Sequence, residues 1–266
     1  MTTPVANRHL FHPGLRVALA QIPIEDGNLA RNMELARVVA AEAKRQNVQF
    51  LNFPEAADWG WLHQQARRDA FPIPGIYTDF LADLAQRYQI WISTGCLERV
   101  GDNVYNSAVI VNRFGQIVLK HRKIDTLTWL TKDLYDPGEP QDIKVVETEF
   151  GTIGMTICAD NFNLDRPKRV ASQGAWLLVA PHGFAAEPDK SKQNSKEYED
   201  HILKAAREAR LWVIATDAVL GTVQGGAWKG WRHSGCSVIA RPDGTAAATG
   251  KFLEPDLVIF DIPPAA

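Results

Sequence analysis

Three reactive side chains each follow an apolar stretch, at the point where a strand is expected to end. They are Glu55, Lys123 and Cys158, and they come directly after segments 50–54, 116–122 and 154–157. Open α/β sheets gather their chemistry at the carboxyl ends of strands, so we expect these side chains to lie close together. A carboxylate, an ammonium group and a thiol in equivalent positions suit a nucleophilic site.

The chemistry of such a site follows from the residue types. A thiol has a pKa near 8.5 in water, so Cys158 needs a base or a positive neighbour to react at neutral pH. Glu55 can act as that base and can return the proton to a leaving nitrogen. Lys123, with a backbone N–H near Cys158, can stabilise a developing oxyanion.

Each of the three residues alone also has a purely structural interpretation. Free cysteine is among the most buried residue types and commonly fills a core. A glutamate after proline and a lysine in the basic run 120–123 are often solvated. Their joint placement at strand ends is what favours a functional site.

Composition narrows the class of protein. The chain has 266 residues, 45% of them hydrophobic and 23% charged, which predicts one globular domain over residues 1–266. A net charge of -2 gives no indication of a nucleic-acid partner. Residues 1–11 lack the apolar core of a secretory leader, and no stretch of about 18 apolar residues predicts a membrane span.

The chain has three cysteines, at positions 96, 158 and 236. A small and odd number of cysteines argues against a disulfide framework. They favour a reducing compartment, so we expect a cytoplasmic protein. The sequence contains no Cys-x-x-Cys or His-Glu-x-x-His spacing. We therefore expect no metal site and no cofactor.

Periodicity predicts alternating helices and strands. The predicted helices are 28–46, 77–88, 165–173 and 195–209. The predicted strands are 15–22, 48–53, 90–96, 105–111, 116–122, 143–148, 152–157, 176–180, 212–215, 235–240 and 257–261. Turns at 112–115 and near Gly151 make two hairpins within this alternation. The mixture indicates a two-sheet sandwich with helices outside, and the polar stretch 187–198 is expected to be a lid.

Three motifs in this order resemble the nitrilase superfamily of carbon-nitrogen hydrolases. They are Pro54-Glu55, Tyr105-Asn106-Ser107 leading through Gly115 to Arg122-Lys123, and the segment 154–160 around Cys158. Segments 17–21, 233–237 and 242–244 agree, so the likeness runs from residue 15 to about residue 261. The resemblance implies an α/β fold with a four-layer αββα sandwich, and a homodimer or higher homo-oligomer. It also implies Glu55 as base, Lys123 as oxyanion stabiliser and Cys158 as nucleophile.

One departure from the family pattern affects the acid/base assignment. Many members carry a second glutamate between the lysine and the cysteine, shortly before a Pro-Gly pair. Here Thr131 stands in that region, and Asp133 is the nearest carboxylate, while Glu139 follows the glycine and comes too late. We expect Asp133 to orient a proton or the lysine, with a solvated loop residue as the alternative.

Three further residues are candidates for binding a substrate: Trp59, Asn161 and His182. His182 follows a buried-looking strand, and a hydrogen-bonded structural histidine is the alternative. Trp59 and Trp61 come just after Glu55, and packing between helices is the alternative for both. The glycine-rich segment 221–230 lacks the Lys-Ser/Thr of a phosphate loop.

We therefore predict an enzyme that hydrolyses a small-molecule amide to an acid and ammonia through a thioester on Cys158. Two alternatives within the fold are a nitrilase and an N-carbamoyl hydrolase. An alternative from another class is a binding protein that keeps the fold without activity, and Thr131 in place of a glutamate is its best support.

Overall fold

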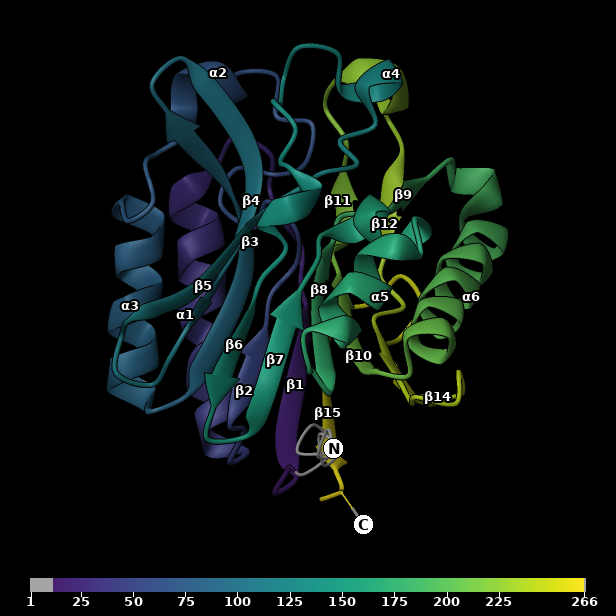
Figure 1. Cartoon of the computed structure of the whole chain (residues 1–266). Helices are drawn as coiled ribbons and strands as arrows, with labels where there is room; N and C mark the ends of the chain where they lie inside the picture. Colours follow the sequence, from purple (N-terminus) through teal and green to yellow (C-terminus); the bar gives the residue numbers. More distant parts are fainter. Residues whose placement is uncertain (1–11, 266) are drawn as a thin grey trace.

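The structure, a computed structural model, describes residues 12–265 and consists of two six-stranded sheets packed face to face with helices on both outer faces (Figure 1). Separate apolar cores fill the space between the sheets and the space between each sheet and its helices. This arrangement is a four-layer αββα sandwich, so the predicted fold class is confirmed.

The first sheet has the strand order β15-β1-β2-β3-β4-β5. Its strands are β1 (Leu15–Gln21), β2 (Phe50–Asn52), β3 (Trp91–Val100), β4 (Asn103–Val111), β5 (Ile117–Arg122) and β15 (Asp256–Ile262). β1, β2 and β3 are parallel, while β4 and β5 form the hairpin predicted around residues 112–115. Parallel pairing brings the segments that follow β2 and β3 to one edge of the sheet.

The second sheet has the order β14-β13-β10-β8-β7-β6. Its strands are β6 (Val145–Thr148), β7 (Gly151–Met155), β8 (Leu177–His182), β10 (Trp212–Asp217), β13 (Val238–Ala240) and β14 (Ala246–Thr249). All six residues of β8 are buried, as expected for a strand covered on both faces. A small third sheet joins β9 (Ala185–Ala186), β11 (Val219–Thr222) and β12 (Arg232–Ser234).

Two long helices cover each sheet. α1 (Leu29–Arg45) and α3 (Ile76–Tyr88) pack on the first sheet, and α5 (Asp165–Ser172) and α6 (Ser191–Ala209) pack on the second. α1 begins where the Asn28 side chain accepts a hydrogen bond from the N–H of Arg31. Short helical turns occupy the loops; they are α2 (Ala66–Asp69), α4 (Thr128–Thr131), η2 (Pro140–Asp142), η3 (Cys158–Phe162), η4 (Pro188–Lys190) and η5 (Gly226–Trp228).

The structure departs from the predicted elements in two places. The stretch 187–198 is not a loose lid, because α6 begins at Ser191 and buries Ser191, Ser195 and Tyr198. The predicted strand 235–240 is shorter in the structure, where β13 begins at Val238, because Gly235 and Cys236 both have positive φ angles. The helices α2 and α4 and the strands β9, β11, β12 and β14 were not predicted.

The absence of a leader was predicted from residues 1–11, which lie outside the described residues. Over residues 12–265, no helix combines the length and the apolar character needed to cross a membrane. Within the same range, no three His, Cys, Asp or Glu side chains are grouped so that they could hold a metal ion.

Candidate active site

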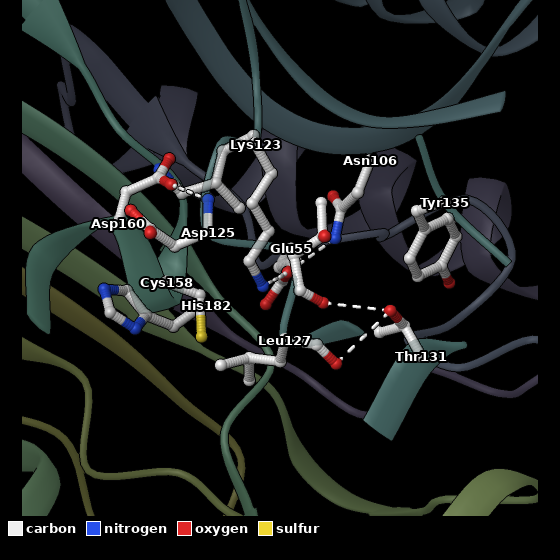
Figure 2. Close-up of polar contacts among 12 residues, drawn as sticks. Glu55, Asn106, Lys123, Asp125, Leu127, Thr131, Tyr135, Cys158, Asp160 and His182 are labelled. Carbon is white, nitrogen blue, oxygen red and sulfur yellow. Dashed lines mark hydrogen bonds and ion pairs between the residues drawn. The ribbon is translucent and has the colours of Figure 1, made fainter. Parts of the chain in front are cut away.

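Glu55, Lys123 and Cys158 meet between the two sheets, at the ends of β2, β5 and β7 (Figure 2). The Nζ atom of Lys123 lies 2.6 Å from Oε1 of Glu55. Asn106, on β4, donates its Nδ2–H to the same carboxylate oxygen at 2.6 Å. All three predicted residues are buried, with exposures of 1% for Glu55, 1% for Lys123 and 4% for Cys158. The structure therefore brings the predicted trio together. It also adds Asn106, a residue of the second motif to which the sequence analysis gave no role.

The second oxygen of Glu55 is free to take a proton. Oε2 is buried and has no hydrogen-bond partner among residues 12–265. It faces Gly183, where a Cβ atom would lie 3.1 Å from Oε2. The backbone N–H of Gly183 also acts to lower the pKa of the Cys158 thiol. Gly183 is thus near both the free oxygen of Glu55 and the thiol.

Cys158 is the first residue of η3, in a strained turn shortly after β7. Its φ angle is +43°, a left-handed conformation that costs a residue with a Cβ atom about 1 kcal/mol or more. Burial raises the pKa of the Cys158 thiol, and the Glu55 carboxylate raises it further, while Lys123 and the Gly183 N–H oppose this shift. The resting thiol is therefore protonated at neutral pH, and its reaction needs a base in direct reach.

The ammonium group of Lys123 keeps its charge despite complete burial. Burial alone would lower the pKa of Lys123, but Glu55, Cys158 and Asp160 together raise it above its usual value. A buried cation next to the thiol is suited to stabilise negative charge that develops there. The same cation acts on His182, whose pKa is lowered to about 3 by burial and by Lys123, so its ring is neutral.

Asp160 connects the segment around Cys158 to the segment that follows Lys123. One oxygen accepts the backbone N–H groups of Ile124 at 3.0 Å and Asp125 at 2.9 Å. The other accepts the N–H of Ile157 at 3.0 Å and lies 2.8 Å from Nε2 of His121. This fully buried carboxylate was not predicted as a site residue, although it follows Cys158 by two positions in the quoted motif.

His182 lies next to Cys158 (Figure 2), and Asn161 contacts the same residue through a hydrogen bond. The Asn161 side chain donates to the carbonyl oxygen of Cys158 at 3.2 Å and accepts from Oγ1 of Thr156 at 2.8 Å. These two hydrogen bonds of Asn161 stabilise the turn at Cys158. His182 approaches the Asn161 amide through Nε2 at 3.4 Å, and its buried Nδ1 has no partner within residues 12–265.

The two tryptophans that follow Glu55 have different surroundings. Trp59 stacks on His63 with a ring separation of 5.5 Å and packs near Phe71 at 5.8 Å. Trp61 lies next to the trio, because Nζ of Lys123 is 5.5 Å from its ring centroid. The side chain that lines the site is therefore Trp61, while the ring contacts of Trp59 fit packing within the loop.

The structure does not bring Asp133 to the trio. Its side chain is exposed, and its backbone oxygen accepts a short hydrogen bond from Nε of Arg67. Asp133 and Thr131 line a surface cavity of about 330 Å³ with Gln64 and Arg67. Thr131 is buried and donates to the carbonyl oxygen of Thr126 at 3.0 Å, within its own turn (Figure 2). The carboxylate of Asp133 is thus exposed to solvent, whereas α4 turns Thr131 inward.

The family model for carbon-nitrogen hydrolases matches residues 16–266, which is nearly the whole chain. The chain belongs to the carbon-nitrogen hydrolase family. Among its relatives, a nitrilase of Pyrococcus abyssi is 27% identical over 93% of this hydrolase and 89% of the relative. The chloroplastic omega-amidase of Arabidopsis thaliana is 24% identical over 92% of this hydrolase and 67% of the relative.

Solved structures of the nitrilase superfamily share the fold of this hydrolase. A mutant of the Nesterenkonia AN1 amidase matches with a TM-score of 0.79 and 19% identity, over 95% of this chain and 91% of that one. Nit3 of Saccharomyces cerevisiae matches with a TM-score of 0.81 and 19% identity, over 96% and 92%. These matches agree with the sandwich described above, and the hydrolase is an enzyme of the carbon-nitrogen class.

Proposed function

We propose that this hydrolase cleaves a small-molecule amide to an acid and ammonia through a thioester on Cys158. The proposal rests on the different surroundings of the two carboxylate oxygens of Glu55. Its Oε1 is held by Lys123 and Asn106, each at 2.6 Å, while its buried Oε2 is unpaired beside Gly183. A carboxylate fixed through one oxygen and free at the other is oriented for proton transfer.

In the first half of the reaction, Glu55 Oε2 takes the thiol proton as Sγ of Cys158 forms a bond to the substrate carbonyl carbon. The carbonyl oxygen becomes negative and is stabilised by the Lys123 ammonium and a backbone N–H of the 158–160 turn. Glu55 then gives its proton to the substrate nitrogen. The C–N bond breaks, ammonia leaves, and a thioester remains on Cys158.

In the second half, water takes the place vacated by ammonia. Glu55 removes a proton from this water as its oxygen attacks the thioester carbonyl, and Lys123 again stabilises the oxyanion. Collapse of the adduct breaks the C–S bond, and the proton held by Glu55 returns to the thiolate. The products are the free acid and the resting thiol, so atoms and charges balance.

The solved structures support a covalent step at the cysteine. In one mutant of the Nesterenkonia AN1 amidase, the acetamide moiety of fluoroacetamide is covalently added at the active-site cysteine. The Pyrococcus relative is a nitrilase, which keeps nitrile hydrolysis as a second candidate on the same residues. An N-carbamoyl hydrolase would use the same nucleophile on a carbamoyl carbon.

Intact-mass spectrometry tests the thioester directly. Acid quenching during turnover of a simple amide should trap an acyl adduct, and peptide mapping should place it on Cys158. The Cys158→Ala variant should form no adduct and release no ammonia, while its unfolding free energy should change by about 1 kcal/mol or less. Ammonia release by the pure variant would contradict covalent catalysis. Failure of wild type to hydrolyse amides, carbamoyl amino acids or nitriles would favour a binding protein.

We also propose a cytoplasmic location, one hydrolase domain over residues 1–266 and a homodimer or larger homo-oligomer. The three free cysteines support the location. The family match over residues 16–266 supports the single domain. Trp59, Asn161 and His182 are proposed as candidates for substrate binding, whereas the exposed Asp133 is left out of the acid/base role.

A further inference from the structure

A row of indole rings runs from the catalytic centre to the surface; we call Trp61, Trp228, Trp129 and Trp231 the tryptophan row. The rings of Trp61 and Trp228 are 5.1 Å apart at 60°. Trp228 meets Trp129 edge to face at 6.3 Å and stacks on Trp231 at 4.5 Å. These separations and angles are those of favourable aromatic contacts.

The inner end of the row belongs to the reaction centre. Trp61 is 4% exposed, and Lys123 Nζ lies 5.5 Å from its ring centroid. A Cβ atom at Gly183 would lie 3.2 Å from Cβ of Trp61 and 3.1 Å from Oε2 of Glu55. The buried Nε1–H of Trp61 has no acceptor within residues 12–265. Trp61 therefore presents both an apolar ring and an unused donor beside the reacting groups.

The outer end of the row lies on short, exposed elements. Trp129, on α4, is 66% exposed, and Trp228 lies at the end of η5. α4 has four residues and η5 has three, and they meet where a Cβ at Gly226 would lie 3.5 Å from the carbonyl oxygen of Leu130. Because Cys158 is 4% exposed, a substrate needs a route inward. The row connects the buried trio to these two short surface elements, which is where such a route would have to begin.

We propose that the tryptophan row binds the acyl group of the substrate, and that this group carries a neutral aromatic ring. The proposal rests on the proposed amide hydrolysis and names its substrate class: primary arylalkyl amides. An aromatic ring gains stacking and edge-to-face contacts along indoles that a short aliphatic chain cannot make. The four side chains of the row carry no charge, so an ionic group placed there would lose its hydration without a counter-ion.

A matched pair of amides tests this preference. Wild type should hydrolyse 3-phenylpropionamide with a kcat/KM about tenfold or more above that for propionamide, the scale of one or two aromatic contacts plus ring burial. In Trp228→Ala this ratio should fall about tenfold, mainly through KM, because binding contacts are lost. Trp228→Phe should retain most of the ratio. Phe114→Ala removes an exposed aromatic ring from the β4–β5 turn and should leave the ratio unchanged.

A direct binding measurement separates this proposal from the proposed function. In Cys158→Ala, 3-phenylpropionamide should change tryptophan fluorescence and bind about tenfold more tightly than propionamide. Aryl binding without any hydrolysis by wild type would contradict amide hydrolysis and support the subsite. Hydrolysis of both amides at equal kcat/KM, or an unchanged ratio in Trp228→Ala, would overturn the subsite. If Trp228→Ala does not fold, Trp129→Ala at the exposed end should lower the ratio about threefold, and no change there would also overturn it.

Discussion

The carboxylate of Asp160 accepts a hydrogen bond from the backbone N–H of Ile124 at 3.0 Å, and this contact ties the nucleophile turn to the residue after Lys123. The second oxygen of Asp160 accepts the N–H of Ile157, the residue before Cys158. Burial acts to raise the pKa of Asp160, but His121 and the backbone N–H groups lower it by more. The net pKa is below the usual value, so the carboxylate is ionised. One charged group thus fixes the spacing between two reactive side chains.

Asp160 should therefore act as a positioning residue. Asp160→Ala should lower kcat about a hundredfold, because small displacements of reacting groups have effects of that size. KM should change less, since Asp160 lies behind the turn and reaches no substrate. Asp160→Asn should recover part of kcat, because its amide oxygen can still accept from Ile124 and Asp125. Equal losses in kcat for Asp165→Ala, on the exposed first turn of α5, would contradict a specific role.

The proximity of the three candidate side chains could be predicted, because strand ends alone determine their positions. Glu55, Lys123 and Cys158 follow strands of two packed sheets, so the fold brings them together without detailed knowledge of loops. Asn106 and Asp160 were present in the quoted motifs, but their roles depend on hydrogen-bond geometry between separate segments. That geometry has no signature in local spacing.

Loops and helix starts explain the errors. The segment 187–198 is polar, which favoured a lid, yet Ser191, Ser195, Tyr198 and Ile202 are buried at helical spacing on α6. Their pattern was readable as a helix face. Asp133 was chosen by distance along the chain, whereas the short turn α4 directs Thr131 inward and leaves Asp133 exposed. Such a turn depends on contacts with η5, about a hundred residues later.

Lys120, in β5, and Lys123, directly after this strand, offer a matched comparison. Lys123→Gln should lower kcat about a hundredfold or more, because it removes the proposed oxyanion stabiliser and the partner of Glu55. Lys120→Gln should keep kcat within about twofold, since Lys120 is paired with Glu98 and not with a member of the trio. Steady-state ammonia release measures both. Equally mild effects would mean that the basic run is only a solvated strand end.

Glu98 should make stability depend on pH. Burial raises the pKa of Glu98, but Arg122, Lys120 and Ser107 lower it more, from 4.5 to about 2. Because the folded pKa is the lower one, this stabilisation is present above pH 4.5 and is lost as the pH falls towards 2. Denaturant unfolding should show Glu98→Gln less stable than wild type by about 3 kcal/mol at pH 7. The difference should shrink below pH 4.5; a constant difference would contradict this linkage.

Removal of the negative charge of Asp133 should affect neither activity nor stability, contrary to the expectation from sequence. Its side chain is exposed, and its contact with Arg67 uses the backbone oxygen, which asparagine retains. Asp133→Asn should therefore leave kcat, KM and the unfolding free energy nearly unchanged, within about 0.5 kcal/mol. A loss of kcat of tenfold or more at unchanged stability would restore the acid/base role proposed for this carboxylate.

The bond that is cleaved can be tested with a matched amide and nitrile. The segment Cys158-Ala159-Asp160 resembles the Cys-x-Asp of the amidases more than the Cys-Trp-Glu of true nitrilases, and the structure engages Asp160 in four polar contacts. Amide hydrolysis needs one proton delivered to a departing nitrogen, which the free oxygen of Glu55 can supply. Nitrile hydrolysis passes through a thioimidate and needs a different order of proton transfers.

We expect kcat/KM for ammonia release from 3-phenylpropionamide to exceed that from 3-phenylpropionitrile by about tenfold or more, the scale of one well-placed proton transfer. A preference for the nitrile would assign this hydrolase to the chemistry of its Pyrococcus relative instead.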